Sequence, residues 1–221
     1  GVAVLEMMKK EHGCVPDCVS YSTVLHGLLK CNEVVAAFEV YKEMVGLGLE
    51  VDLRMMGTLV RNLCESSWKD RDRGGLLQDA GEVFEKMLEW GWVVDQGTFE
   101  VMVQALCEGK RFDQALANLY EMVRLGYSPE VIAFDKVIQG LRDEGRVDDA
   151  VSALVFLHAN EGIPNRDSFD VLIKELNEEG RFFGASNLFC AALKLGVVTI
   201  REPELNVIRG RNCKLIQELV R

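Results

Sequence analysis

The sequence predicts an all-α fold, an α-solenoid of stacked helix-turn-helix repeats about 35 residues long. Three observations support this prediction: equivalent side chains recur at a fixed interval, apolar residues within each interval follow a helical period, and Gly or Pro residues separate the helical stretches. A fixed period of roughly 20 to 50 residues is the signature of repeat architectures. Because one helical hairpin cannot bury its apolar face alone, neighbouring repeats are expected to stack.

Four columns of side chains keep one register along the chain, with intervals of 35 residues and a single interval of 43. The small column is Ala37, Ala80, Ala115, Ala150 and Ala185. The leucine column is Leu28, Leu63, Leu106, Leu141 and Leu176. Two bulky columns are Tyr21, Met56, Phe99, Phe134 and Phe169, and Tyr41, Phe84, Leu119, Leu154 and Phe189. Small side chains are expected where two helices approach to about 8–10 Å.

The columns divide the chain into five repeats with a part before and a part after them. The repeats are 18–52, 53–95, 96–130, 131–165 and 166–200. Repeat 2 holds eight extra residues, and its polar stretch at about 66–76 predicts an enlarged turn between two helices. Residues 1–17 are expected to carry the second helix of a partial preceding repeat, and residues 201–221 a C-terminal capping helix.

Repeat 3 illustrates the helical period within a repeat. Its first stripe follows the spacing i, i+3, i+4, i+7 of a core-facing helix and consists of Phe99, Met102, Val103 and Leu106. A second stripe follows a short turn, and Gly126 then predicts a left-handed helix terminus. Pro129 prevents that helix from continuing. Each repeat is therefore expected to be two helices joined by turns.

Composition narrows the class of function. The formal net charge is −10, whereas nucleic-acid binders usually carry a basic stripe. No apolar run is long enough to span a bilayer, so a membrane partner is not expected. The seven cysteines contain no Cys-x-x-Cys pair, which favours buried thiols in a reducing compartment over disulfides or metal ligands.

Motifs for catalysis are missing from the sequence. The histidines His12, His26 and His158 lie in different repeats, and no His-x-Glu with a Cys-x-x-Cys partner is present to hold zinc. There is also no Gly-rich phosphate loop ending in Gly-Lys-Ser or Gly-Lys-Thr. We therefore expect no enzyme activity, no cofactor, no metal site and no small-molecule substrate.

Several blocks of the sequence resemble the pentatricopeptide repeat family, the organellar RNA-binding proteins most abundant in plants. VSYSTVLHGL at 19–28 resembles the family's first helix. RFDQA at 111–115 and RVDDA at 146–150 resemble the start of its second helix, and GYSPE at 126–130 and GIPN at 162–165 resemble its linker. The Trp-x-x-Leu-Gly signature of tetratricopeptide repeats is missing. Without a deaminase-like tail, the repeats resemble the simpler, non-editing class of the family.

This resemblance implies a right-handed superhelix that binds single-stranded RNA with one base per repeat. In the family, the fifth residue of the first helix and the last residue of the repeat read the base edge, and an aliphatic second residue wedges between bases. The fifth positions are Ser22, Gly57, Glu100, Asp135 and Asp170. The last positions are Asp52, Asp95, Glu130, Asn165 and Ile200. The second positions are Val19, Arg54, Gly97, Ile132 and Asp167.

Repeat 1 matches the family pattern best, because Val19 can sandwich a base and Ser22 with Asp52 resembles the family's combination for a purine, guanine first. The thirteenth residue of a repeat is commonly basic in the family and contacts phosphate. The thirteenth residues are Lys30, Glu65, Glu108, Asp143 and Glu178. The RNA-binding residues that the resemblance implies are Val19, Ser22, Lys30, Asp52, Arg54, Arg61, Asp95, Ile132, Asp135 and Asn165.

We therefore expect an organellar RNA-binding protein that acts in transcript processing, stability or translation, in the mitochondrion or alternatively the chloroplast. No transit segment is present, and the first residues read as the end of a helix, so such a segment is expected upstream. Acids at the thirteenth positions of repeats 2 to 5 and at the fifth positions of repeats 3 to 5 leave two alternatives open beside base reading by most of these repeats. The acids form a solvated surface while other repeats bind RNA, or they bind a basic segment of a protein partner, which makes the chain an interaction scaffold.

Overall fold

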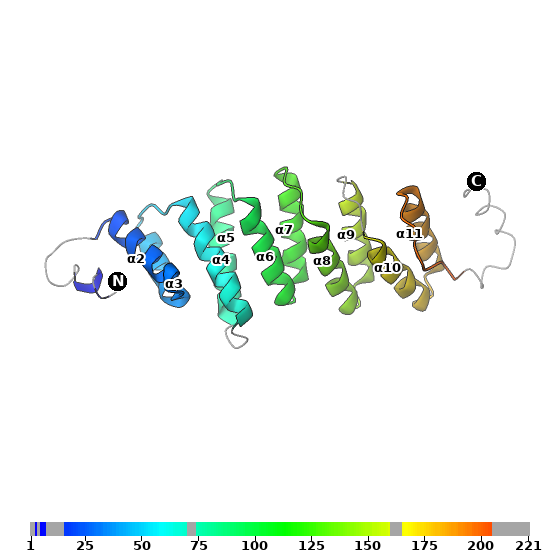
Figure 1. Cartoon of the computed structure of the whole chain (residues 1–221), viewed down its shortest axis with the longest axis horizontal. Coiled ribbons are helices and arrows are strands. Elements are labelled where there is room, and N and C mark those ends of the chain that lie inside the picture. The colour runs from blue at the N-terminus through cyan, green and yellow to red at the C-terminus, as the bar shows by residue number, and fades with distance from the viewer. Residues whose placement is uncertain (1–2, 4, 8–15, 70–73, 160–164, 205–221) are drawn as a thin grey trace. The chain divides into compact units, whose positions relative to one another are not determined.

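The computed structural model describes residues 3, 5–7, 16–69, 74–159 and 165–204. Within these ranges every regular element is a helix, and successive helices pair as hairpins (Figure 1). The predicted all-α fold is therefore confirmed. Most of the helix predicted within residues 1–17, and all but the first four residues of the predicted capping segment 201–221, lie outside the described residues.

Each hairpin has a first and a second helix. The first helices are α2 (Cys18–Lys30), α4 (Leu53–Lys69), α6 (Gln96–Glu108), α8 (Val131–Asp143) and α10 (Arg166–Glu178). The second helices are α3 (Val34–Gly46), α5 (Gly74–Glu89), α7 (Phe112–Arg124), α9 (Val147–Ala159) and α11 (Phe182–Lys194). Every first helix begins at the residue where the sequence pattern starts a repeat.

The chain forms two compact units, residues 1–129 and residues 130–221. In the first unit, α4 packs against both α2 and α6, while α3 and α5 each pack against the first helix that follows them. In the second unit, α8 packs against α10, and α9 packs against α10 as well. Within each unit, consecutive hairpins therefore stack in the manner of an α-solenoid.

The alanine column lies in the packed interior of both units. All five of its members are 0% exposed. The first bulky column is equally buried, and in it the ring of Phe99 meets the ring of Phe84 edge-on at 5.0 Å between centroids. Two predicted core residues depart from this pattern: Leu28 is half exposed, because α2 buries Leu29 in its place, and Phe189 on the last described hairpin is half-buried.

The second helix of repeat 3 ends as the sequence predicts. Gly126 has a φ of 85°, a left-handed conformation that strains residues with a Cβ atom. The N–H group of Tyr127 donates to the carbonyl oxygen of Met122 at 2.9 Å, and that of Gly126 to Val123 at 3.0 Å. These two bonds form a Schellman motif and satisfy carbonyl groups that the helix leaves unpaired.

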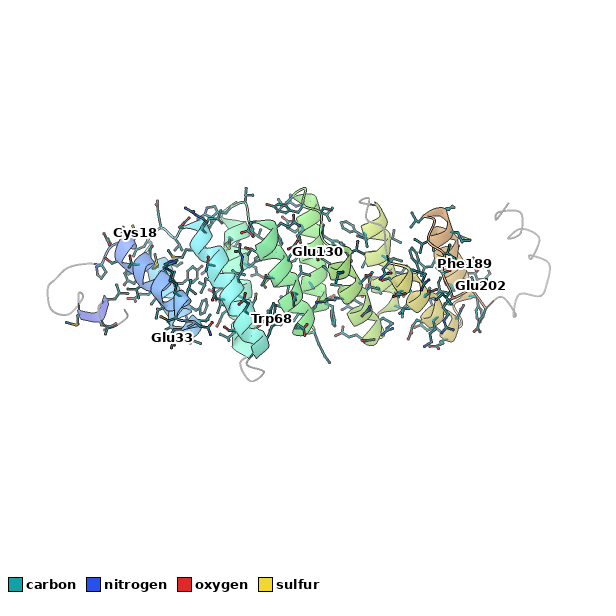
Figure 2. The ribbon with its side chains drawn as sticks, viewed as in Figure 1. Cys18, Glu33, Trp68, Glu130, Phe189 and Glu202 are labelled. Atoms are coloured by element: carbon teal, nitrogen blue, oxygen red, sulfur yellow. The ribbon has the colours of Figure 1, made fainter. Side chains whose placement is uncertain are left out.

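The extra residues of repeat 2 lengthen its helices, so the enlarged turn predicted at about 66–76 is wrong for most of that stretch. Helix α4 has 17 residues and α5 has 16, whereas the first and second helices of the other hairpins have 13. The hydroxyl of Ser67 donates to the carbonyl oxygen of Cys64 at 2.6 Å and so is satisfied inside a helix. Figure 2 shows Trp68 near the end of α4.

A hollow of about 140 Å³ lies among α5, α6 and α7 where Gly81 follows the column alanine. In repeat 1 the equivalent position holds the buried Phe38. A Cβ atom on Gly81 would stand 3.7 Å from Cε of Met102, which is an ordinary van der Waals contact. The missing side chain therefore leaves the space unfilled.

We predict that Gly81→Ala raises the free energy of unfolding by about 1 kcal/mol from helix propensity, with a few tenths more from the new contact. Urea unfolding followed by tryptophan fluorescence measures this, since Trp68, Trp90 and Trp92 all lie in the first unit. Gly27→Ala is the matched control, because its Cβ atom would meet nothing within 4 Å and gains propensity alone. A smaller gain at Gly81 than at Gly27 would show that the hollow cannot accept a methyl group.

Candidate nucleic-acid interface

The last residue of a repeat is the N-cap of the next first helix. Asp95 accepts a hydrogen bond from the N–H group of Thr98 at 2.9 Å, and Asp17 accepts one from Ser20 at 2.9 Å. Asn165 caps α10 in the same way. An N-cap favours a short side chain with an acceptor oxygen, which explains Asp and Asn at these positions, whereas Glu130 before α8 makes no cap hydrogen bond with its side chain. The cap fixes this side chain at the start of a helix.

The fifth residues of α4 and α8 lie beside the start of the next first helix. A Cβ atom on Gly57 of α4 would stand 3.3 Å from Oγ1 of Thr98 and 3.7 Å from Oδ2 of Asp95. In the second unit, Asp135 of α8 accepts a hydrogen bond from the hydroxyl of Ser168 at the start of α10. The structure therefore brings the predicted fifth and last positions together, and a hydroxyl at the third position of the next repeat joins them.

Repeat 1 presents these positions around an open hollow of about 550 Å³, within the range of roughly 300–1,000 Å³ usual for ligand sites. Its lining includes Cys18, Val19, Ser22, Thr23, His26, Glu50, Val51 and Asp52. Val19 is 65% exposed, and Asp52 is exposed as well. The hydroxyl of Ser22 makes no hydrogen bond to any other residue in the described ranges, so it remains available to a ligand.

In repeat 2, the side chain of Arg61 fills the space beside the fifth position. Nη2 of Arg61 donates to Oδ1 and Oδ2 of Asp95 at 2.8 and 2.7 Å. Nη2 and Nε of the same residue also donate to Oγ1 of Thr98, at 3.0 and 3.2 Å. The guanidinium group therefore bridges α4 and the start of α6, across the position where Gly57 has no side chain.

The pairing with Arg61 contributes to a lowered pKa of Asp95. Partial burial is the largest single influence and raises the pKa, but hydrogen bonds from Thr98 and the charge and hydrogen bonds of Arg61 together outweigh it. The pKa of Asp95 therefore lies below its ordinary value, and the carboxylate stays ionised at neutral pH. Since the side chain is 58% exposed, the pair adds little to stability.

Repeats 3 and 4 also satisfy their fifth residues internally. Glu100 accepts a hydrogen bond from Nε2 of Gln96 at 2.8 Å on the same helix. Asp135 is only 9% exposed and is bonded to Ser168, which places it inside the second unit. Ile132, by contrast, is 63% exposed at the second position of repeat 4. Of the residues predicted for repeat 4, Ile132 and the exposed N-cap residue Asn165 are open to a ligand, whereas Asp135 is not.

Repeat 5 uses its fifth residue to hold the chain that follows it. Asp170 accepts hydrogen bonds from the backbone N–H groups of Ile200 and Arg201, both at 2.7 Å. About two turns further along α10, Nδ2 of Asn177 donates to the carbonyl oxygen of Glu202 at 2.9 Å (Figure 2 labels Glu202). Residues 201–204 are not helical. Both side chains are therefore anchors for the backbone.

Two predicted phosphate-binding cations, Lys30 and Arg54, are exposed on the first helices of repeats 1 and 2. Lys30 is exposed at the end of α2, and the side chain of Arg54 is 94% exposed, with Asp52 3.9 Å away. The thirteenth residues of repeats 2 to 5 are all exposed acids: Glu65, Glu108, Asp143 and Glu178. At the thirteenth position, repeat 1 is therefore the repeat that offers a cation to a phosphate group.

The cysteines only partly follow the predicted pattern. Cys64 is buried, and burial followed by the charge of Glu65 raises the pKa of its thiol to about 12. Cys18 and Cys31, in contrast, are exposed. In the part of the chain that the structure describes, no group of three or more His, Cys, Asp or Glu side chains could hold a metal ion. No helix in that part is long and apolar enough to cross a membrane.

Comparison with known proteins agrees with this architecture. A model of the PPR repeat family matches residues 16–65, which include α2, α3 and most of α4. Pentatricopeptide repeat-containing protein At5g46100 of Arabidopsis thaliana is 30% identical over 98 residues, which cover 44% of this chain and 19% of that protein. Pentatricopeptide repeat-containing protein At1g10270 of the same plant is 29% identical over 49% of this chain and 11% of its own length. The matches span less than a fifth of these two relatives.

Solved structures share the fold at low sequence identity. The pentatricopeptide repeat protein PPR10 from maize aligns with 99% of this chain and 30% of its own, at 18% identity and a TM-score of 0.52. The PPR domain of Arabidopsis thaliana protein-only RNase P 1, solved in complex with tRNA, aligns with 90% of this chain and 93% of its own, at 15% identity and a TM-score of 0.55. The family expected from the sequence is therefore supported: the PPR repeat family model matches residues 16–65, and these similar proteins of Arabidopsis thaliana are pentatricopeptide repeat proteins.

Proposed function

We propose that this chain binds single-stranded RNA along its first helices and that the hollow of repeat 1 receives a base. The observation that supports this most strongly is the hollow itself, which combines an exposed aliphatic side chain, an unengaged hydroxyl and an exposed carboxylate. Aliphatic and aromatic faces stack on bases, and polar groups at one edge select among them.

The chemistry of the hollow favours a purine base, and among the purines it favours guanine. The carboxylate of Asp52 only accepts hydrogen bonds when ionised, so it suits a base edge that donates. The Watson–Crick edge of guanine offers two adjacent donors, and the hydroxyl of Ser22 can donate or accept beside them. Val19, three residues before Ser22 on the same helix, supplies an apolar face for the ring.

The comparisons support RNA as the ligand class at the level of the family. The PPR domain of protein-only RNase P 1 was solved with tRNA, and its fold resembles that of this chain. We propose a binding role without catalysis for the chain, in transcript processing, stability or translation within an organelle, the mitochondrion or alternatively the chloroplast.

Filter binding of the 221-residue chain to a random pool of single-stranded RNA tests this proposal. We expect saturable binding at low salt with a shallow salt dependence, because Lys30 and Arg54 can neutralise about two phosphates. Each such contact with a single strand contributes a slope of about −0.7. Loss of all saturable binding at low salt would contradict the proposal.

Ser22→Ala and Asp52→Ala are each expected to weaken binding by about tenfold, the scale of one lost hydrogen bond to a charged or polar group. Ser152→Ala is the matched control, because its hydroxyl only donates to the backbone of Asp148 on the second helix α9. Equal affinities for all variants would show that the hollow of repeat 1 takes no part. Capture of a basic protein partner after nuclease treatment, without RNA binding, would instead support the scaffold alternative.

A further inference from the structure

Repeat 2 has no side chain at its fifth position, yet that position is filled. Gly57 is buried, and the Cβ atom that a larger residue would carry there lies 4.0 Å from Nη2 of Arg61. Arg61 lies one helical turn further along α4 and extends back over Gly57 to reach Asp95 and Thr98. Its guanidinium group thus lies beside the last-position carboxylate, where a fifth residue would otherwise lie.

The hydrogen bonds of Arg61 leave part of its guanidinium group available. Nε and Nη2 make the hydrogen bonds to Asp95 and Thr98, and Nη1 makes none with the residues that the structure describes. The side chain is 41% exposed. Because Asp95 and Thr98 hold the group from one side, its orientation is fixed while two N–H donors remain for a ligand.

We propose that Arg61 determines the base specificity of repeat 2, and that it selects guanine through the acceptor atoms O6 and N7. This inference rests on the proposed RNA-binding function and extends it to a residue outside the fifth and last positions. Arginine donates only, and the two free N–H groups of Nη1 can be shared between the O6 and N7 atoms of guanine, which are adjacent acceptors. A base whose exposed edge offers a donor at that place, such as the amino group of adenine, is disfavoured.

A guanidinium group also binds phosphate, and the two contacts affect RNA binding differently. A base contact changes preference at a single nucleotide position, whereas a phosphate contact changes affinity equally for all sequences. The restraint of Arg61 by Asp95 favours the base, because Asp95 is itself a last-position residue at the base-reading edge and its negative charge repels a phosphate.

The test is selection from a single-stranded RNA pool with a randomised central octamer, using the full chain. The wild type is expected to enrich a purine at the nucleotide that repeat 1 binds and guanine at a neighbouring nucleotide. Arg61→Gln should reduce the preference for guanine at that neighbour by about five- to a hundredfold and leave the purine unchanged. Arg61→Lys should also lose the guanine preference, because an ammonium group cannot bond both acceptors from a fixed plane.

Arg111→Gln is the matched control, since Nη1 of Arg111 donates to Gln78 on the second-helix side at 2.9 Å. It should select the same RNA as the wild type. Equal loss of affinity for all four bases in Arg61→Gln, with recovery in Arg61→Lys, would identify a phosphate contact and overturn the inference. An unchanged motif in Arg61→Gln would overturn it as well. Failure of the wild type to select any RNA would instead overturn the proposed function on which the inference rests.

Discussion

Replacement of Phe99 by alanine should lower the free energy of unfolding of the first unit by about 3–5 kcal/mol, the usual cost of removing a buried phenyl ring. The ring is 0% exposed, and its centroid lies 5.0 Å from that of Phe84 and 6.1 Å from that of Tyr127. It therefore joins α6 to the preceding second helix and to the linker after α7. Because single domains are stable by only about 5–15 kcal/mol, this loss is large.

Urea unfolding followed by tryptophan fluorescence measures the effect of Phe99→Ala, because all three tryptophans belong to the first unit. Leu47→Ala provides the control in the same unit, since Leu47 is 56% exposed and should change stability by less than about 0.5 kcal/mol. Similar stability of the two variants would contradict the assignment of Phe99 to the stacked core.

Removal of the Asp170 carboxylate should free the segment that follows repeat 5. Asp170→Ala leaves the N–H groups of Ile200 and Arg201 without their acceptor, and a hydrogen bond to a charged group contributes about 1.5–3 kcal/mol. We expect the second unit to lose about 2 kcal/mol. Hydrogen exchange at the amides of Ile200 and Arg201 should accelerate by more than tenfold, while exchange in α8 changes little.

Asp170→Asn distinguishes the effect of the negative charge from that of the acceptor atom, because asparagine is neutral but keeps one carbonyl oxygen at the same place. It should recover roughly half of the protection at these two amides. Hydrogen-exchange mass spectrometry of both variants and thermal unfolding by circular dichroism provide the measurement. Unchanged exchange at Ile200 and Arg201 in Asp170→Ala would show that the carboxylate does not anchor this segment.

The sequence was sufficient to predict the fold because small and bulky side chains repeat in fixed phase. Burial of all five column alanines follows directly from that phase, and the first helices begin where the repeats were expected to begin. The leucine column failed at Leu28, where the alternative Leu29 is one residue away and both fit a helical stripe. A pattern of period 3.6 does not distinguish such neighbours.

The polar stretch in repeat 2 leads to a wrong prediction of a turn, because polar residues are also compatible with helical backbone. Ser66 and Ser67 are compatible with a helix when the hydroxyl bonds a carbonyl of the preceding turn, as that of Ser67 does. The signal that limits the helices is the pair Gly74-Gly75, which begins α5. Local composition alone does not report this kind of satisfied serine.

The sequence predicts which residues lie at the candidate site, but it does not predict which hydrogen bonds their side chains make. The Asp-x-x-Thr spacing of Asp95 and Thr98 is an N-cap signal that sequence reasoning overlooked, and it would have located the hydroxyls beside the fifth positions. The pairing of Arg61 with Asp95, 34 residues apart, has no local signature. Only the absence of a side chain at Gly57 could have indicated that another residue fills the space.

The internal use of Asp135 and Asp170 likewise depends on contacts 30 or more residues away in the sequence. Both are fifth-position residues, and Asp135 is among the residues that the family resemblance predicts to bind RNA. The structure instead gives each a partner within the second unit, a hydroxyl in one case and two backbone amides in the other. We therefore propose that base reading is concentrated in repeats 1 and 2.

The most direct test of this account is photochemical cross-linking of the full chain to single-stranded RNA that carries 4-thiouridine, with the cross-linked peptides identified by mass spectrometry. We predict cross-links in α2, in residues 50–52 and in α4, where Val19, Ser22, Asp52 and Arg61 lie. Competition with unlabelled RNA should remove them. Cross-links confined to the second helices α3 and α5 would contradict the account.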